Sequence, residues 1–192
     1  MTIVAACICA DDKVVVMSDS AITCENGYRL LTSTGKWWTY PNLVIGTSGD
    51  DLVLSRIKRK LDNHKKSIDI YRNPETFSDI MFQVQQEIRG EGALEGLEAE
   101  LLHISFDKKG KPSIYVLGGE GGISGPFPYA CVGDPSVMGM LGLNILLKPT
   151  RMKKRTVIKV VNAFTELMGQ VASLHNSVES PFYHLILEYE SS

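Results

Sequence analysis

Cysteine and histidine are the residue types that most often supply nucleophiles or metal ligands. The sequence has four cysteines: Cys7, Cys9, Cys24 and Cys131. Cys7 and Cys9 lie two apart in an apolar, β-branched run, so their side chains share one face of an expected strand, where they are poorly placed to bridge. Thiols inside a buried strand are normally inert. We therefore expect reduced cysteines and rank a cysteine-based enzyme as a distant alternative.

The histidines do not form a metal-binding pattern either. His64, His103, His175 and His184 are scattered along the chain. The Cys7-Ile8-Cys9 pair has no second Cys or His pair at the spacing that zinc sites use. The sequence predicts neither a metal site nor a cofactor.

The chain begins with strands. Apolar, β-branched runs at 2–9 and 13–20, separated by a turn at 10–12, predict a hairpin that starts at the first residues. Both runs are apolar almost throughout, which predicts burial on both faces of the sheet. Runs at 37–40 and 43–47 flank Pro41-Asn42 and predict a second hairpin.

Helices and further strands follow in alternating blocks. A helix is expected after Gly49-Asp50-Asp51 and a second after Asn73-Pro74, because apolar residues recur there at spacings of three and four residues. Strands are expected at 101–106, 113–117 and 128–132, a helix from Asp134-Pro135, a long helix over 157–171 and a last strand over 182–189. The glycine-rich 118–125 segment is interpreted as a loop.

This order of elements predicts an α+β fold in a single domain spanning residues 1–192. Two antiparallel sheets would lie face to face with a helix pair outside each, a four-layer αββα sandwich. The 192 residues fit one core of ordinary size.

Composition excludes several classes of protein. Twenty Lys and Arg against 22 Asp and Glu give a formal net charge of -2, so no positive field gathers nucleic acid. No apolar run is long enough to span a membrane. The start of the chain lacks the basic residues and cleavage site of a secretory signal, so we expect a cytoplasmic protein without membrane partners.

Several motifs resemble the β-type subunits of the proteasome family, most of all the bacterial HslV and Anbu-type members, which are N-terminal-nucleophile hydrolases. They are Thr2-Ile3-Val4, Val14 to Ser20 with Ser18-Asp19-Ser20, Gly35-Lys36, Leu43 to Asp50, and Tyr129 to Gly133 before a helix. The resemblance covers most of the chain in element order, and it implies the same αββα sandwich.

The resemblance implies a threonine peptidase. After removal of Met1, the Thr2 hydroxyl would attack a peptide carbonyl, and its own α-amine, with a reference pKa of about 7.7 to 8.0, would take the proton. Lys36 would keep that amine basic, Asp19 would fix Lys36, and the Gly46 N–H would stabilise the oxyanion. Taken singly, each of these residues also has a purely structural interpretation. Asp19 suits a turn, Lys36 suits an exposed strand edge, and Gly46 suits a bend between a strand and a helix.

Further residues follow from the same resemblance. Asp134 and Ser177 occupy accessory positions near the expected site, where Asp134 equally suits a helix N-cap. The substrate pocket would be lined by Ile22, Thr34, Trp38, Val44 and Ser48 and would favour small or medium hydrophobic side chains.

Two functions remain open on the sequence. The first is a threonine peptidase subunit of a self-compartmentalising homo-oligomer, for which a ring, peptide or unfolded-protein substrates and an ATPase unfoldase partner are implied by the resemblance. The second is a catalytically silent assembly protein of the same fold that retains Met1. The basic stretches 56–66 and 148–159 suit either a partner surface or ordinary solvated helix faces.

Overall fold

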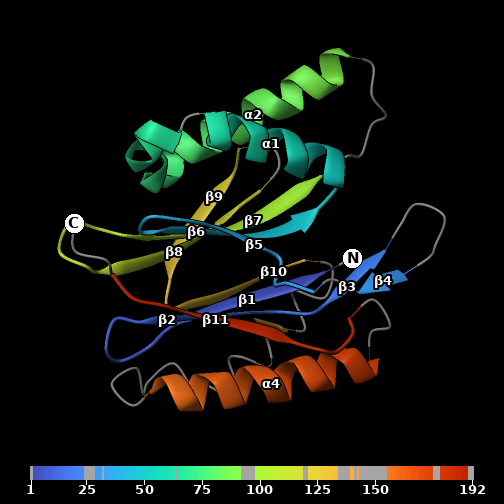
Figure 1. Ribbon diagram of the computed structural model, residues 1–192, viewed down its shortest axis with the longest axis vertical. Coiled ribbons are helices and arrows are strands. Elements are labelled where there is room, and N and C mark those ends of the chain that lie inside the picture. Colours follow the sequence, from blue (N-terminus) through green and yellow to red (C-terminus); the bar gives the residue numbers. More distant parts are fainter. Residues whose placement is uncertain are drawn as a thin grey trace.

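Two β-sheets stack face to face between layers of helices in the computed structural model (Figure 1). The structure describes residues 2–23, 29–31, 33–63, 65–91, 98–118, 121–133, 139–140, 142, 155–174 and 178–189, and the side chains of 22, 23, 29–31 and 65–68 are outside that description. This is the predicted α+β, αββα arrangement.

The first sheet has four antiparallel strands in the order β10-β1-β2-β11. They are β1 (Ile3–Ile8), β2 (Val14–Ser18), β10 (Tyr129–Gly133) and β11 (Tyr183–Leu187). The central strands β1 and β2 pair from Val4↔Ser18 to Ile8↔Val14 and are almost wholly buried, as expected for strands without polar alternation. The predicted N-terminal hairpin is confirmed.

The second sheet has five antiparallel strands in the order β5-β6-β7-β8-β9. They are β5 (Trp37–Tyr40), β6 (Leu43–Gly49), β7 (Ala99–Phe106), β8 (Pro112–Leu117) and β9 (Ile123–Phe127). A separate two-stranded ribbon consists of β3 (Ala21–Thr23) and β4 (Arg29–Leu31).

Helices α1 (Asp51–Asn63) and α2 (Pro74–Gly90) cover the outer face of the five-stranded sheet, and the short 3-10 helix η1 (Lys65–Arg72) connects them. Asn73 caps α2 by accepting a 2.9 Å hydrogen bond from the Glu75 N–H, and Pro74 follows at the first helical position. Helix α4 (Val157–Leu174) covers the four-stranded sheet on the opposite side of the molecule (Figure 1).

Three apolar clusters separate the four layers. One lies between α4 and the four-stranded sheet around Phe164, and one between α1, α2 and the five-stranded sheet around Phe77. The third fills the space between the sheets and includes Val4, Val44 and Leu102. Because β1 and β6 face each other across this third cluster, it joins the two sheets.

The sequence patterns did not predict β3, β4 or β9. The 118–125 segment is interpreted as a loop in the sequence, but β9 begins at Ile123 and pairs with β8 with a register shift between Ile114 and Val116. Its residues are mostly exposed and include a glycine and a proline, so it lacks the apolar alternation of a typical strand. The helix expected from Asp134-Pro135 begins outside the described residues. Within those that are described, no helix is long and apolar enough to cross a membrane.

Candidate active site

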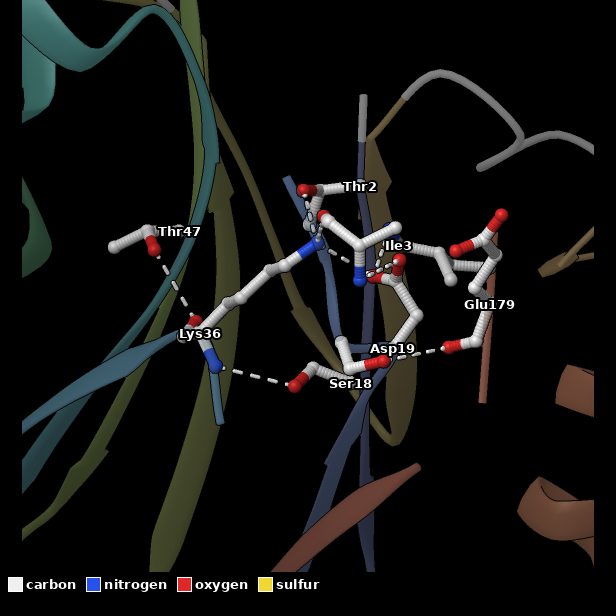
Figure 2. A network of polar contacts seen from close by, with 9 residues as sticks. Thr2, Ile3, Ser18, Asp19, Lys36, Thr47 and Glu179 are labelled. Carbon is white, nitrogen blue, oxygen red and sulfur yellow. Dashed lines mark hydrogen bonds and ion pairs between the residues drawn. The ribbon is translucent and has the colours of Figure 1, made fainter. Parts of the chain in front are cut away.

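Thr2, Asp19 and Lys36 come together at one end of the two sheets (Figure 2). Thr2 directly precedes β1, and Asp19 directly follows the adjacent strand β2. Because β1 and β2 are antiparallel neighbours, the start of one lies beside the end of the other. Lys36 directly precedes β5 of the opposite sheet, so the cluster draws on both sheets.

Asp19 is fully buried and is an acceptor for three donors. Its Oδ1 accepts the Ile3 N–H at 3.1 Å and the Lys36 Nζ at 2.9 Å, and its Oδ2 accepts the Ala21 N–H at 3.1 Å. The Asp19 N–H in turn donates to the Ile3 carbonyl at 3.3 Å. A buried carboxylate needs such partners, since an isolated charge is strongly disfavoured in the interior. The carboxylate therefore fixes the first residues of β1 as well as the lysine.

The Lys36 ammonium lies between Asp19 and the Thr2 hydroxyl. Its Nζ is 2.6 Å from Thr2 Oγ1, and it also donates to the Asp19 carboxylate and to the Ala21 carbonyl. An ammonium has three protons, and these three acceptors use all of them. The side chain is only 8% exposed. Burial lowers the pKa of Lys36 below its usual range, while the adjacent Asp19 charge acts in the opposite direction.

The main chain of Lys36 is bound to both sheets. Its N–H donates to Ser18 Oγ at 3.1 Å, and its carbonyl accepts the Thr47 N–H at 2.9 Å and the Thr47 hydroxyl at 3.2 Å. Ser18 is fully buried at the end of β2, and Thr47 is buried in β6. Figure 2 shows these bonds on either side of the lysine. The ammonium is consequently aimed at Thr2 from a fixed backbone.

Gly133, at the end of β10, packs against the main chain of Thr2. Its φ is +113°, and a Cβ at this position would lie 1.8 Å from the Thr2 carbonyl oxygen and 3.2 Å from Ser48 Oγ. Only glycine fits such a conformation and such a close approach. The sequence pattern places Gly133 before a helix but gives no sign of this contact with Thr2.

Gly46 does not have the role expected from the sequence. Two hydrogen bonds at the ends of the β6–β7 pairing fix which residues of β6 bond to β7. The Phe106 N–H donates to the Asn42 carbonyl and the Asp50 N–H donates to the Glu98 carbonyl, in the same register that pairs Gly46 with Leu102. Hydrogen bonding alternates along an antiparallel strand, so the Gly46 N–H points at Leu102 in β7 and is not directed at Thr2. A Cβ on Gly46 would lie 2.9 Å from Val4 Cγ1. Gly46 instead allows close packing between the sheets.

The same alternation turns the N–H groups of Thr47 and Gly49 toward the side of β5. That of Thr47 is taken by the Lys36 carbonyl. Gly49 lies two residues after Thr47, beyond the point where β5 begins, so no residue of β5 faces its N–H. Its φ is +125°, and the main chain of Glu98 and Ala99 occupies the space that a Cβ would need. Its neighbour Ser48 lies beside Gly133, which contacts Thr2. Gly49 is therefore a better candidate for an oxyanion donor than Gly46.

The expected substrate pocket is not assembled as such. Val44 is buried in the cluster between the sheets, whereas Trp38 packs against the cluster below α1 and α2, on the other face of the same sheet. Residues on opposite faces of one sheet do not line one pocket. Ser48 is buried near Gly133, and Thr34 is exposed. The Ile22 side chain lies outside the described part.

Trp38 instead lines a shallow hollow between β5 and α1. Its volume is about 290 Å³, and its walls are Trp37, Trp38, Thr39, Tyr40, Lys58 and Asp62. The Tyr40 hydroxyl donates to Asp62 Oδ1 at 3.2 Å, and burial together with that carboxylate raises the pKa of Tyr40.

The accessory positions Asp134 and Ser177, like Met1 and His175, fall outside the residues that the structure describes. Three of the four cysteines are described, and all three are buried free thiols. Burial raises the pKa of Cys7 to about 12 and that of Cys9 to about 11. Thiols with such pKa values are poor nucleophiles at neutral pH.

Comparison with known proteins agrees with the fold described above. Among solved structures, Anbu from Pseudomonas aeruginosa in its helical assembly matches with a TM-score of 0.79 and 16% identity, over 99% of this chain and 83% of that one. The Gly-1 mutant of Anbu from Hyphomicrobium sp. strain MC1 matches with a TM-score of 0.77 and 13% identity, over 98% and 82%.

HslV from Trypanosoma brucei matches with a TM-score of 0.69 and 19% identity, over 98% of this chain and all of that one. At these identities the likeness establishes the fold. No sequence among the curated proteins matches the chain. The family model of the proteasome subunit matches residues 2–179, and this chain therefore belongs to the proteasome subunit family.

Proposed function

We propose that this protein is a threonine-type peptidase subunit of a proteasome-like assembly, with Thr2 as nucleophile after Met1 is removed. The observation that carries the proposal is the 2.6 Å hydrogen bond from Lys36 Nζ to Thr2 Oγ1, within a cluster completed by the buried Asp19. A nucleophilic hydroxyl, a cation beside it and a carboxylate that orients the cation are three of the parts that this chemistry uses, and the α-amine of Thr2 is the base.

The reaction begins when the Thr2 hydroxyl attacks the carbonyl carbon of a peptide bond. The free α-amine of Thr2 accepts the hydroxyl proton, and the Lys36 ammonium favours the developing alkoxide through its hydrogen bond to Oγ1. The negative charge that collects on the substrate oxygen is stabilised by the Gly49 N–H, which replaces Gly46 in this role. We assign the accessory positions Asp134 and Ser177 no step.

The tetrahedral intermediate then collapses. The C–N bond breaks, the proton on the α-amine passes to the leaving amine, and an ester between Thr2 and the acyl half of the substrate remains. A water molecule attacks this ester with the α-amine again as base, and release of the carboxylic acid restores the Thr2 hydroxyl. No metal or cofactor takes part, since attack, proton transfer and charge stabilisation are all supplied by the chain.

The family and the related folds support assembly into a homo-oligomer. Anbu from Pseudomonas aeruginosa is described as forming a helical assembly. We extend this to a cytoplasmic, self-compartmentalising complex that cleaves peptides or unfolded proteins, in which an ATPase unfoldase delivers the substrate.

The first test is the intact mass of the purified assembly before and after incubation with a peptide epoxyketone, which captures a threonine through both its hydroxyl and its α-amine. We expect loss of one methionine and one adduct per chain. Thr2→Ala is the matched control and should assemble normally without any adduct. Retained Met1 without an adduct would instead identify the silent assembly protein.

A further inference from the structure

Glu100 is a carboxylate beside the site that the proposed chemistry does not use. It lies in β7, half-buried and opposite Ser48 of β6 in the sheet register. Its Oε2 accepts a 2.9 Å hydrogen bond from the N–H of Gly133, which belongs to the other sheet. The side chain thus spans the two sheets at the end of the molecule where Thr2 lies.

The sheet register explains why Gly133 needs this acceptor. The Ile8 N–H donates to the Pro128 carbonyl at 2.9 Å, and alternation from that pair makes Ile3 and Gly133 a pair that exchanges no hydrogen bonds. The Gly133 N–H therefore points away from β1. In the sheet as described, β10 is an edge strand with no neighbour on that side. Glu100 supplies the partner that a further strand would otherwise provide.

Thr2 is thereby held between two carboxylates. On one side Asp19 binds the N–H of Ile3, the residue that follows Thr2. On the other side Glu100 binds the N–H of Gly133, whose backbone fills the space directly against the Thr2 carbonyl. The first residues of a chain are poorly ordered unless they are tied down. Both carboxylates therefore restrict the main chain around Thr2. The Thr2 hydroxyl needs such restriction, because it reacts from one orientation only.

We propose that Glu100 is a positioning residue that holds Gly133 against Thr2 and so keeps the Thr2 hydroxyl on the Lys36 ammonium. This inference rests on the proposed function of Thr2 for its effect on rate. Its geometric content, that Glu100 orders the Gly133 backbone, stands apart from catalysis and is tested separately.

The experiment uses the full-length assembly with Met1 removed and compares Glu100→Ala with Glu100→Gln. The amide of Gln still offers an oxygen to the Gly133 N–H, while Ala does not. Displacements of about 1 Å cost about 100-fold in rate. We therefore expect Glu100→Ala to lower kcat on a fluorogenic peptide by about 10- to 100-fold with KM within about twofold, and Glu100→Gln to stay within about threefold of the parent. Glu166→Ala, an exposed carboxylate on α4, is the control for loss of charge.

Rates are expressed per site that forms an epoxyketone adduct, so partial misfolding does not count as a catalytic defect. Deuterium exchange of the fragments that contain residues 129–133 and 2–7 is measured in parallel, and Glu100→Ala should speed exchange in both. If Glu100→Ala does not fold, Glu100→Asp is used instead. Asp keeps the charge, but its shorter side chain does not reach the Gly133 N–H, so the same fall in kcat and the same faster exchange are expected.

A Glu100→Ala protein with unchanged kcat and unchanged exchange would overturn the inference. So would a Glu100→Gln protein as slow as Glu100→Ala, because the charge and not the hydrogen bond would then be what matters. If the parent protein itself forms no adduct and cleaves no peptide, the proposed function fails. The exchange measurement then still decides whether Glu100 orders Gly133.

Discussion

The ion pair in the site and the ion pairs between α1 and α2 differ in almost every physical respect. Lys36 and Asp19 are 8% and 0% exposed, and both make further hydrogen bonds to the main chain. Arg56 forms two bonds to Glu91, at 2.8 and 2.5 Å, but the Glu91 side chain is 58% exposed. Lys60 and Glu87 form a similar exposed pair at 2.7 Å.

The difference indicates what each kind of pair is for. Exposed pairs contribute about 0 to 1 kcal/mol, because water and salt screen them. A buried pair loses several kcal/mol of hydration per ion, which its mutual attraction only partly recovers, so apolar residues of similar volume are often at least as stable. The Lys36–Asp19 pair is therefore poorly explained by stability alone. Its location 2.6 Å from a threonine hydroxyl favours a chemical role.

The largest effect on stability is expected when one member of the buried pair is removed. Asp19→Ala leaves the Lys36 ammonium and two backbone N–H groups without their acceptor, and breaking a buried pair in this way costs about 3 to 5 kcal/mol. Urea unfolding followed by circular dichroism measures the change. A loss below about 1 kcal/mol would show that the pair behaves like those on the surface.

Removal of both charges should separate stability from chemistry. We expect the double variant Asp19→Asn with Lys36→Met to unfold within about 2 kcal/mol of the parent, because no uncompensated charge remains and Asn still accepts a backbone N–H. Peptide hydrolysis should nevertheless be abolished. The same unfolding experiment and a fluorogenic peptide assay measure both quantities. A double variant that still cleaves peptides would contradict the catalytic role of Lys36.

His103 extends the comparison to a buried group that has no charged partner. It is fully buried in β7, its Nε2 is 2.8 Å from the Tyr71 carbonyl, and no described residue binds its Nδ1. Burial lowers its pKa to about 4. In the unfolded chain this histidine binds a proton near pH 6.5, whereas in the folded protein it stays neutral down to about pH 4. His103 therefore leaves the free energy of unfolding unchanged above pH 6.5 and lowers it as the pH falls from 6.5 to 4.

The expected slope is at most about 1.4 kcal/mol per pH unit over that interval, levelling below pH 4. Urea midpoints measured from pH 7.5 to 4 test this, and His103→Gln should flatten the profile because the amide does not titrate. An equally steep profile in the variant would assign the pH dependence to other groups.

The smallest effect is expected on the surface. Arg56→Ala should lower the free energy of unfolding by no more than about 1 kcal/mol and should leave peptide hydrolysis unchanged. The loss should shrink further in 1 M salt, where exposed charges are screened. A loss comparable to that of Asp19→Ala would remove the contrast between the two kinds of pair.

The sequence predicted the elements with strong patterns. The buried strands β1 and β2 and the amphipathic helices α1, α2 and α4 follow from apolar runs and from spacings of three and four. The closeness of Thr2, Asp19 and Lys36 agrees with the expectation from the family resemblance. Their roles in catalysis remain predictions.

Other features depend on three-dimensional detail that one-dimensional patterns do not contain. The direction of the Gly46 N–H is set by the register of β6 on β7, and the opposite faces of Trp38 and Val44 are set by the pleat. The contact of Glu100 with Gly133 joins residues of different sheets. No local signal in the sequence marks such a pair.

Because the site draws residues from both sheets, it is incomplete in the nascent chain during synthesis. Thr2 and Asp19 are made first, but Gly133 and the strand that carries it are among the later products of translation. An unfinished chain therefore holds the threonine without the backbone that packs against it. If Thr2 is the nucleophile, the backbone that surrounds it is complete only after the later strands have been made and have folded.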